Sequence, residues 1–208
     1  MRLFSYIVKH DTGFSPNPFH GYCTLACCKP AIRRTAQKGD WVVGLTPKSG
    51  GNRIVYLMRV DESPMTYAEY WNDKRFKAKR PRYNDGVLAR CGDNIYEPQG
   101  SNHRQLHSTH SEGVRENPGN KAHDLGGKYV LVSETFAYFG SQPIELSDEL
   151  TALVPGRGHR SRFPDEVKEA FLRFTQAVIF GVHAAPHTWK QGDTSWNTGG
   201  CGFKVRTK

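Results

Sequence analysis

The chain has 208 residues, of which 37% are hydrophobic, and it carries a formal net charge of +9 at pH 7. This length fits one domain with long insertions, and no apolar run reaches the roughly 20 residues that span a bilayer. The first ten residues are too interrupted for a signal peptide, so we expect a cytoplasmic protein. The positive charge favours a polyanionic partner, usually nucleic acid; the alternative is a basic protein without such a partner.

Residues 2–9 form the first expected strand, and residues 10–22 follow as a loop. Two prolines and two glycines forbid regular structure in this loop. It also carries three aromatic residues, Phe14, Phe19 and Tyr22. They either plug one end of the fold or form a rim on which a base stacks.

Five cysteines are present, an odd number that fits reduced thiols. They are Cys23, Cys27, Cys28, Cys91 and Cys201. Their spacing contains no CxxC pair, so we expect no zinc or other metal site, and no cofactor. Cys27 and Cys28 directly precede an expected helix, where a thiol is either a nucleophile with a lowered pKa or a small buried hydrophobe.

Pro30 suits the first turn of that short helix, which is expected over residues 30–38 with Gly39 as its left-handed cap. Arg33 and Arg34 lie in its first turns. Because helix N-termini attract anions, these two side chains either contact a phosphate or are ordinary solvated charges.

Residues 39–62 hold two apolar, β-branched runs around a polar break, which predicts a hairpin. In the second run, alternation would place Ile54, Tyr56, Met58 and Val60 on one face and Val55 and Leu57 on the other. Both faces are apolar. We therefore expect strands that are covered on both sides, as in a small closed barrel carrying helices.

The densest positive charge in the chain follows a short helix expected over residues 65–71. Six cations surround Phe76 there: Lys74, Arg75, Lys77, Lys79, Arg80 and Arg82. They form either an arm that neutralises the phosphates of a nucleic acid backbone or a solvated loop.

Residues 91–96 form a compact polar turn around Gly92. Asp93 and Asn94 can read a base edge, and Tyr96 can stack on a base or form a hydrogen bond. The alternative is an Asx turn that only closes a hairpin.

Residues 99–127 show no periodicity that supports a helix, and a loop of this length is either functional or disordered. Four histidines fall within it: His103, His107, His110 and His123. They could serve a metal site or the acid–base chemistry of a hydrolytic site, or be structural or exposed.

The last part of the chain has a strand over residues 128–133 and a cationic loop at residues 157–160. A final helix begins at Pro164 and stops at Gly181. Its core face is formed by Val167, Phe171, Phe174 and Val178, at steps of four, three and four residues.

Five segments occur together and in order: residues 10–19, 22–30, 39–41, 91–96 and 156–160. This set resembles the nucleotide-modification-associated domain type 2 family over about residues 1–180. The resemblance implies a role in bacterial or phage systems that make or recognise modified DNA bases. Residues 39–62 are also similar to PUA-like barrels such as the EVE, ASCH and YTH domains, most of which bind nucleic acid.

We therefore predict an α+β fold, with a small PUA-like β-barrel, covering helices and long loop insertions over residues 1–185 and a polar, glycine-rich tail over residues 186–208. The first hypothesis is a module that takes one flipped or single-stranded modified nucleotide of DNA into a pocket. The predicted nucleotide contacts are His10, Asp11, Phe14, Asn17, Phe19, Tyr22, Asp93, Asn94 and Tyr96. The predicted phosphate contacts are Arg33, Arg34, Lys74, Arg75, Lys77, Lys79, Arg80 and Arg157.

The second hypothesis is an enzyme that acts on a modified base or nucleotide. Similarity to ASCH-type proteins implies that such a barrel can host hydrolysis of modified nucleosides. The candidate nucleophiles are Cys23 and Cys27, and the candidate acid–base groups are His10, Asp93 and His110.

Overall fold

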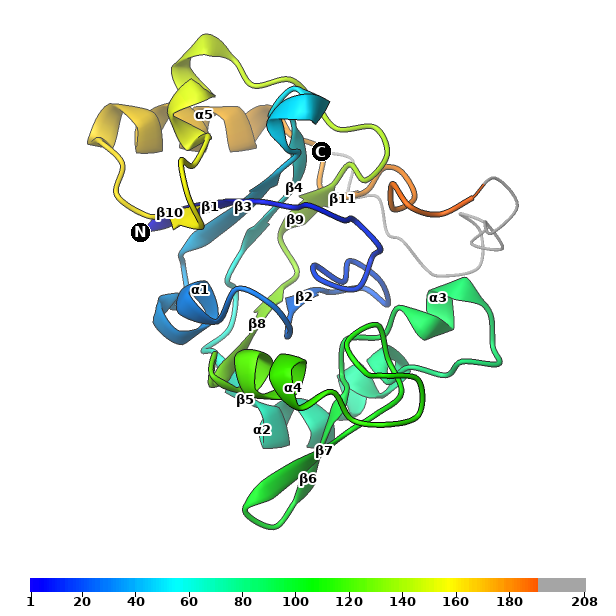
Figure 1. Ribbon diagram of the computed structural model, residues 1–208. Coiled ribbons are helices and arrows are strands. Elements are labelled where there is room, and N and C mark those ends of the chain that lie inside the picture. The colour runs from blue at the N-terminus through cyan, green and yellow to red at the C-terminus, as the bar shows by residue number, and fades with distance from the viewer. Residues whose placement is uncertain (191–208) are drawn as a thin grey trace.

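The computed structural model describes residues 1–190 and shows an α+β fold of several sheets with few helices (Figure 1). The strands are β1 (Leu3–Ile7), β2 (Cys23–Leu25), β3 (Trp41–Leu45), β4 (Ile54–Arg59), β5 (Met65–Thr66), β6 (Tyr96–Gln99), β7 (Asn102–Gln105), β8 (Tyr129–Ser133), β9 (Phe136–Tyr138), β10 (His159–Arg160) and β11 (Gly181–Val182). The α-helices are α1 (Pro30–Thr35), α2 (Tyr67–Asn72), α3 (Val87–Arg90), α4 (Pro118–Leu125) and α5 (Asp165–Ala177). Three 3₁₀ helices lie among the described residues: η1 (Lys48–Gly50), η2 (Lys74–Lys79) and η3 (Asp148–Leu153).

The larger sheet has six strands in the order β10-β1-β3-β4-β9-β11. β1 and β3 are parallel, as are β9 and β11, whereas the other neighbours are antiparallel. β10 and β11 are its two edges, so the strands described make an open sheet and no closed barrel. The predicted α+β class is confirmed, and the predicted PUA-like barrel is not.

The hairpin predicted over residues 39–62 is confirmed, because β3 and β4 pair antiparallel at the centre of this sheet. Tyr56, Met58 and Val60 pack on one face and Leu57 on the other, as alternation predicts. Ile54 and Val55 lie on the faces opposite to those predicted. The reason is a register shift opposite Gly44, which leaves an extra residue in β4 and reverses the alternation beyond it.

One face of the large sheet is covered by η3 and α5 (Figure 1). The predicted core face of α5 is confirmed, since Val167, Phe171, Phe174 and Val178 all pack into this layer. Asp165 and Glu166 occupy the first turn of the helix, where negative charge is favourable.

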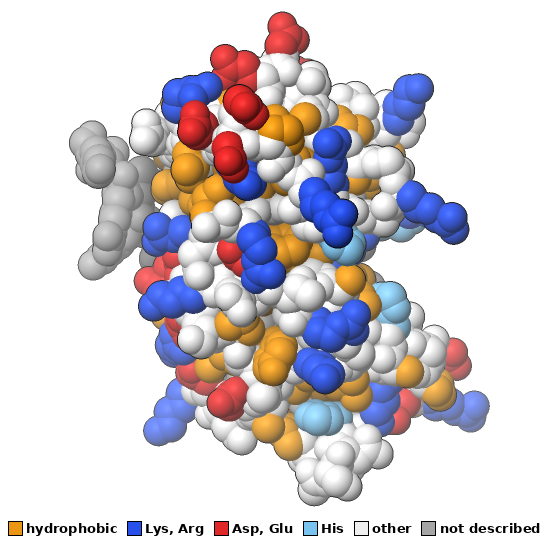
Figure 2. Space-filling view, turned by 90° about the vertical axis from the view of Figure 1, so that its left-hand side faces the viewer, with side chains coloured by type: hydrophobic (Ala, Val, Ile, Leu, Met, Phe, Trp, Pro, Cys, Tyr) orange, Lys and Arg blue, Asp and Glu red, His pale blue; other side chains and the backbone are white. Residues whose placement is uncertain are grey.

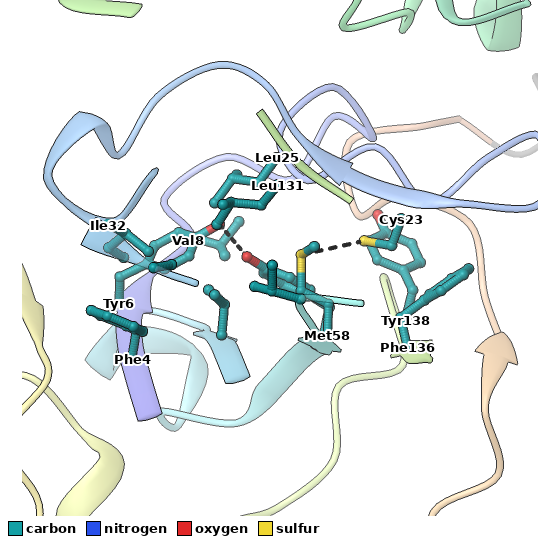
Figure 3. Packing of buried hydrophobic residues seen from close by; sticks show 14 of the residues in the cluster. Phe4, Tyr6, Val8, Cys23, Leu25, Ile32, Met58, Leu131, Phe136 and Tyr138 are labelled. Carbon is teal, nitrogen blue, oxygen red and sulfur yellow. Dashed lines mark hydrogen bonds between the residues drawn. The ribbon is translucent and has the colours of Figure 1, made fainter. Parts of the chain in front are cut away.

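The other face of the large sheet packs on a smaller sheet of order β2-β8-β5. Leu25 and Leu131 of the small sheet meet Tyr6 of the large one in this layer (Figure 3). The opposite face of β8 presents Val130 and Val132 to α2 and η2. The small sheet therefore lies between the large sheet and the helical layer, and β2 delivers the chain from this interior to the surface just before α1.

Residues 99–127 are more regular than the sequence predicts. They contain β7, which forms a hairpin with β6, and α4. Asn117 caps α4 by accepting a hydrogen bond from the backbone N–H of Asn120, and Pro118 follows at the first helical position. The short helix expected at residues 30–38 ends earlier, at Thr35. Among the described helices, none combines the length and apolar character that a bilayer crossing requires.

Candidate functional site

Cys28 lies on a sharp turn between β2 and α1. Its φ is 57° and that of the next residue, Lys29, is 42°, so two consecutive non-glycine residues occupy the left-handed region. Such backbone costs about 1–2 kcal/mol per residue and is typical of functional sites. The strand–turn–helix arrangement leaves the Cys28 side chain half-buried, whereas that of its neighbour Cys27 is fully buried.

Two residues from distant parts of the chain complete a hydrogen-bonded series with this thiol. The Sγ atom of Cys28 lies 3.5 Å from Nε2 of His110, and Nδ1 of His110 lies 2.6 Å from Oδ2 of Asp124. The other oxygen of Asp124 accepts a hydrogen bond of 2.7 Å from the backbone N–H of Cys28. Thiol, imidazole and carboxylate in this order form the nucleophile, base and orienting group of a catalytic triad.

The charges of His110 and Asp124 are coupled. Burial alone would lower the pKa of His110, but the Asp124 carboxylate and Cys28 outweigh it and raise the pKa to about 10. Burial would likewise raise the pKa of Asp124, but the hydrogen bond from His110 holds it below its ordinary value. At neutral pH the pair is therefore an imidazolium and a carboxylate. The Sγ atom of Cys28 therefore lies next to a positive charge, an environment typical of reactive cysteines.

A buried arginine stabilises this arrangement by hydrogen bonds to its backbone. Arg33 is fully buried, and its guanidinium donates to the backbone oxygens of Cys28 at 2.6 Å and of Asp124 at 2.6 Å. It also donates to the hydroxyl of Tyr67. Gly127 makes room for it, since a Cβ there would lie 2.4 Å from the guanidinium carbon. Tyr96 adds a hydrogen bond of 2.8 Å to Asp124.

The thiol opens into a cleft of about 520 Å³. The wall comes from β1 and the segment after it, the Cys28 turn, the His110 loop and β10. Its basic residues besides His110 are Lys9, His10, Lys29, His123 and His159. No carboxylate lies in this wall as the structure describes it, so the cleft favours an anionic ligand.

The coupling of His110 and Asp124 predicts a pH-dependent stability. The pKa of His110 is raised from 6.5 to about 10 on folding, so its contribution is complete below pH 6.5 and is lost as the pH rises toward 10. We expect the free energy of unfolding of the wild type to exceed that of His110→Gln by less at pH 9.5 than at pH 7, as measured by urea titration. The exposed His123, replaced by Gln, serves as the control and should show no such change. An equal difference at both pH values would contradict this coupling.

The structure corrects the predicted nucleophiles. Cys23 lies in the core between the two sheets, 4.0 Å from Sδ of Met58, and burial raises its pKa (Figure 3). Cys27 is also fully buried, and burial raises its pKa well above the ordinary value. Neither residue lines the cleft, whereas Cys28 does. Of the predicted acid–base groups, His110 contacts the thiol and His10 lies in the cleft wall.

Three of these groups could also approach a metal ion. Potential ligand atoms of Cys27, His110 and Asp124 lie within 4.8 Å of one another. However, the Cys27 side chain is fully buried outside the cleft wall, and Nδ1 of His110 and Oδ2 of Asp124 are already joined by a hydrogen bond of 2.6 Å. This donor set favours a proton relay over a metal centre.

Two of the loop residues predicted to contact a nucleotide, His10 and Phe14, line the cleft. The Phe14 ring lies 4.8 Å from that of His110, so it forms a wall beside the base. Asp11 is buried and accepts a hydrogen bond from Tyr138, and burial raises its pKa. It lies outside the cleft wall.

The other three loop residues pack against the rest of the protein. The amide oxygen of Asn17 accepts a hydrogen bond from the ammonium of Lys79. Phe19 stacks on Trp189, at the described start of the tail predicted over residues 186–208; residues 191–208 lie outside the described residues. Tyr22 meets the edge of Phe76. Their predicted contacts with a nucleotide stay predictions.

The polar turn at residues 91–96 is buried. The carboxylate of Asp93 accepts hydrogen bonds of 2.7 Å from Thr24 and from Tyr70, and burial raises its pKa. The amide of Asn94 donates to backbone oxygens of Tyr70 and Phe76. These side chains join the turn to its neighbours and do not reach the cleft, while Tyr96 reaches the site only through Asp124. A role at a base edge stays a prediction.

The cationic segment at residues 74–82 is largely engaged within the protein. Lys79 is fully buried, Arg75 pairs with Glu62 and Asp73, and Arg80 lies 3.8 Å over the ring of Trp71. Lys74 and Lys77 are exposed, as are Arg34 and Arg157. Arg157 and Arg34 belong to segments that border the cleft, since Gly158, His159 and the first residues of α1 are in its wall, whereas Lys74 and Lys77 do not.

The family model for nucleotide modification associated domain 2 matches residues 1–193. The chain belongs to this family. The match extends over all the residues that form the Cys28 site, and it places the protein among those involved in nucleotide modification. Neither the curated proteins nor the solved structures contained a match to the chain.

Asp124 is not among the predicted catalytic residues, and Cys28, for which the sequence leaves a nucleophile or a buried thiol open, is not among the candidate nucleophiles. Local signals for both exist. Lys29-Pro30 after a short apolar strand marks a forced turn before a helix, which is a favourable place for a nucleophile. Asn117-Pro118 predicts a helix start, and Asp124 lies near the end of that helix.

Proposed function

We propose that this protein is a cysteine-dependent enzyme that cleaves or transfers an acyl or amide group carried by a modified nucleotide. The observation that carries the proposal is the series Cys28–His110–Asp124, whose thiol opens into a cleft with a cationic wall. The family supplies the nucleotide context. Kinship with PUA-like barrels stays a prediction.

The geometry assigns a role to each group in the reaction. The Cys28 sulfur attacks the carbonyl carbon as the thiolate, with its proton already on Nε2 of His110. The imidazolium gives this proton to the leaving nitrogen or oxygen as the carbonyl–heteroatom bond breaks, which produces a thioester. Water, deprotonated by His110, or an acceptor amine then attacks the thioester and releases the thiol. Asp124 holds the imidazole in the required orientation throughout.

Negative charge on the carbonyl oxygen needs a donor close to the nucleophile. The residue after Cys28 is Lys29, which caps α1 and lines the cleft. Its backbone N–H donates no hydrogen bond within the described part of the chain. The N–H that follows a nucleophile on a strand–turn–helix is a donor to the oxyanion in other hydrolases, and it suits the same role here.

A second candidate function is recognition of a modified nucleotide in DNA without turnover. The observation that favours recognition is that two aromatic side chains, Tyr6 and Phe14, lie beside cationic groups in the cleft wall. Such a wall can stack a flipped or single-stranded base and hold its phosphate. Recognition alone, however, gives no role to a thiol held against an imidazolium.

Thiol labelling tests the proposal. We expect iodoacetamide at pH 7 to modify Cys28 at least about tenfold faster than Cys23, Cys27 and Cys91, which are buried. Peptide mass mapping would locate the label, in a Cys201→Ser background because Cys201 lies outside the described residues. An acyl probe, p-nitrophenyl acetate, should acetylate Cys28 with release of p-nitrophenol, and hydrolysis of the thioester should then release acetate.

Matched variants separate an activated thiol from one that is only accessible. His110→Gln should slow the acetylation by at least about tenfold, because glutamine can neither hold the proton of the thiol nor give a proton to the leaving group. His183→Gln changes an exposed histidine outside the cleft wall and should leave the rate unaltered. Equal rates in the two variants, or label on a buried cysteine first, would contradict catalysis by Cys28 and leave recognition as the function.

A further inference from the structure

We infer that residues 157–162 form a track for the backbone of a single-stranded polynucleotide that enters the Cys28 cleft. The inference rests on the proposed function, because it names the polymer from which the cleft takes its nucleotide. A track of this kind needs three properties: continuity with the cleft, cations without acidic partners, and a length greater than one nucleotide.

Continuity comes from strand β10 at the edge of the large sheet. β10 pairs with β1, and the residues just before and within it, Gly158 and His159, lie in the cleft wall. Further along, Ser161 and Arg162 line a second hollow of about 460 Å³. One short segment therefore joins the two hollows.

The arginines of this segment are exposed and have no acidic partner among the described residues. Arg157 and Arg162 donate no hydrogen bond from their guanidinium groups in this part of the structure. Arg160 bonds only the backbone oxygen of Arg162 and lies 5.2 Å over the Phe163 ring. By contrast, Arg75 and Arg82 of the segment at residues 74–82 have carboxylate partners.

The surroundings reinforce this charge. Lys9 is exposed at the cleft end of the track and has no acidic partner in the described structure. Arg2 and Lys168 also line the second hollow, but each is paired with a carboxylate, Asp40 and Asp165 respectively. Figure 2 shows the side of the molecule that carries β10 and α1, where Lys and Arg side chains are spread over the middle and the acidic side chains gather at the upper end. A polyanion that runs along the middle of this face meets cations over most of its path.

The length of the track favours a polymer over a mononucleotide. At about 3.3 Å per residue, six fully extended residues would cover roughly 16 Å, and the bend at residues 157–158 shortens this segment. A stacked strand advances about 3.4 Å per nucleotide, so the track spans more than one nucleotide and at most roughly five. Since a nucleotide that enters the cleft must leave its neighbours, a single strand enters at less cost than a duplex.

Fluorescence anisotropy with a labelled twelve-nucleotide oligo-dT tests the track. The variant Arg157→Gln/Arg160→Gln/Arg162→Gln should lose affinity at least about tenfold at low salt, and the slope of log K against log salt should flatten by roughly 2, at 0.7 per phosphate contact. The control Lys48→Gln/Arg90→Gln/Arg115→Gln removes the same charge from exposed residues elsewhere and should change affinity less than about twofold.

Three outcomes would overturn the track: an equal loss in both variants, competition by thymidine monophosphate as strong as by the oligonucleotide, or tighter binding of the matching duplex. Acetylation of Cys28, measured on the same preparations, distinguishes the two proposals. An acylated Cys28 with unchanged DNA binding in the track variant removes the track alone. An inert Cys28 with the expected loss of DNA binding removes the enzymatic proposal alone.

Discussion

Replacement of Arg33 by alanine is expected to destabilise the protein by at least about 3 kcal/mol, or to prevent folding. The guanidinium is fully buried and donates to four oxygens: those of Cys28, Tyr67, Tyr129 and Asp124. Each acceptor left without a partner in the interior costs about 1–3 kcal/mol. Urea unfolding monitored by tryptophan fluorescence measures the loss.

The adjacent arginine provides the matched control. Arg34 is exposed and makes a single hydrogen bond to the backbone oxygen of Gly126, so Arg34→Ala should change the free energy of unfolding by about 0.5 kcal/mol or less. Arg33→Lys keeps the charge but not the planar fork, so it should recover only part of the stability. Equal stability of Arg33→Ala and Arg34→Ala would show that the buried hydrogen bonds of Arg33 do not stabilise the fold.

The same comparison addresses the predicted phosphate contact at this helix. The sequence places Arg33 and Arg34 next to each other near a helix start, and nothing local distinguishes them. The structure separates them because the helical turn points Arg33 at the backbone carbonyls of Asp124 in α4 and Tyr129 in β8, which lie 91 and 96 residues further along the chain. Such a partner depends on topology, and periodicity does not reveal it.

The elements that the sequence predicts well are those with a local pattern. The hairpin at residues 39–62 and the core face of α5 follow from alternation and from steps of three and four residues. The faces on which Ile54 and Val55 lie could not be predicted in this way, because a one-residue register shift does not change the hydrophobic pattern of the sequence. The prediction of a closed barrel is not confirmed, for a related reason. Two apolar faces show that the strands are covered on both sides, but they do not show whether the sheet closes.

The candidate site is harder to predict, since its three members come from a turn, a loop and a helix. The choice between Cys27 and Cys28 depends on the left-handed conformation at Cys28 and Lys29, which turns one thiol inward and the other to the cleft. The family resemblance, confirmed over residues 1–193, gives the nucleotide context but names no catalytic residue.

The sequence also does not show which cations are available to bind a polyanion. The sequence counts six cations at residues 74–82, yet a count does not show that Arg75 lies against Glu62 and Asp73 or that Lys79 is buried among backbone oxygens. Cations at residues 157–162 are fewer but free of such partners in the described structure. What a polyanion can use depends on the charge left after local pairing.

Asp124→Asn is expected to weaken both the fold and the reactivity of Cys28. The Asp124 carboxylate is fully buried and accepts hydrogen bonds from the Cys28 backbone, His110 and Tyr96. An amide offers one acceptor oxygen and turns a donor toward groups that also donate. Breaking a buried charged pair costs about 3–5 kcal/mol, so the melting temperature should fall by at least roughly 6 °C.

The effect on chemistry follows from the pKa of His110. Without the carboxylate, the main influences left on the imidazole are burial, which lowers its pKa, and Cys28, which raises it less. The imidazole is then neutral at pH 7.5 and no longer favours the thiolate. We expect acetylation of Cys28 at this pH to slow by at least about tenfold, and the pH–rate profile to shift.

A second buried carboxylate separates this positioning role from a loss of stability alone. Asp93 is as fully buried as Asp124 and also holds two hydroxyl groups, those of Thr24 and Tyr70, but it does not contact His110. Asp93→Asn should therefore lower the melting temperature while the pH–rate profile of Cys28 stays where it is in the wild type. If both variants shift the profile alike, or neither does, Asp124 acts on the thiol only through the stability of the fold, and the triad assignment is wrong.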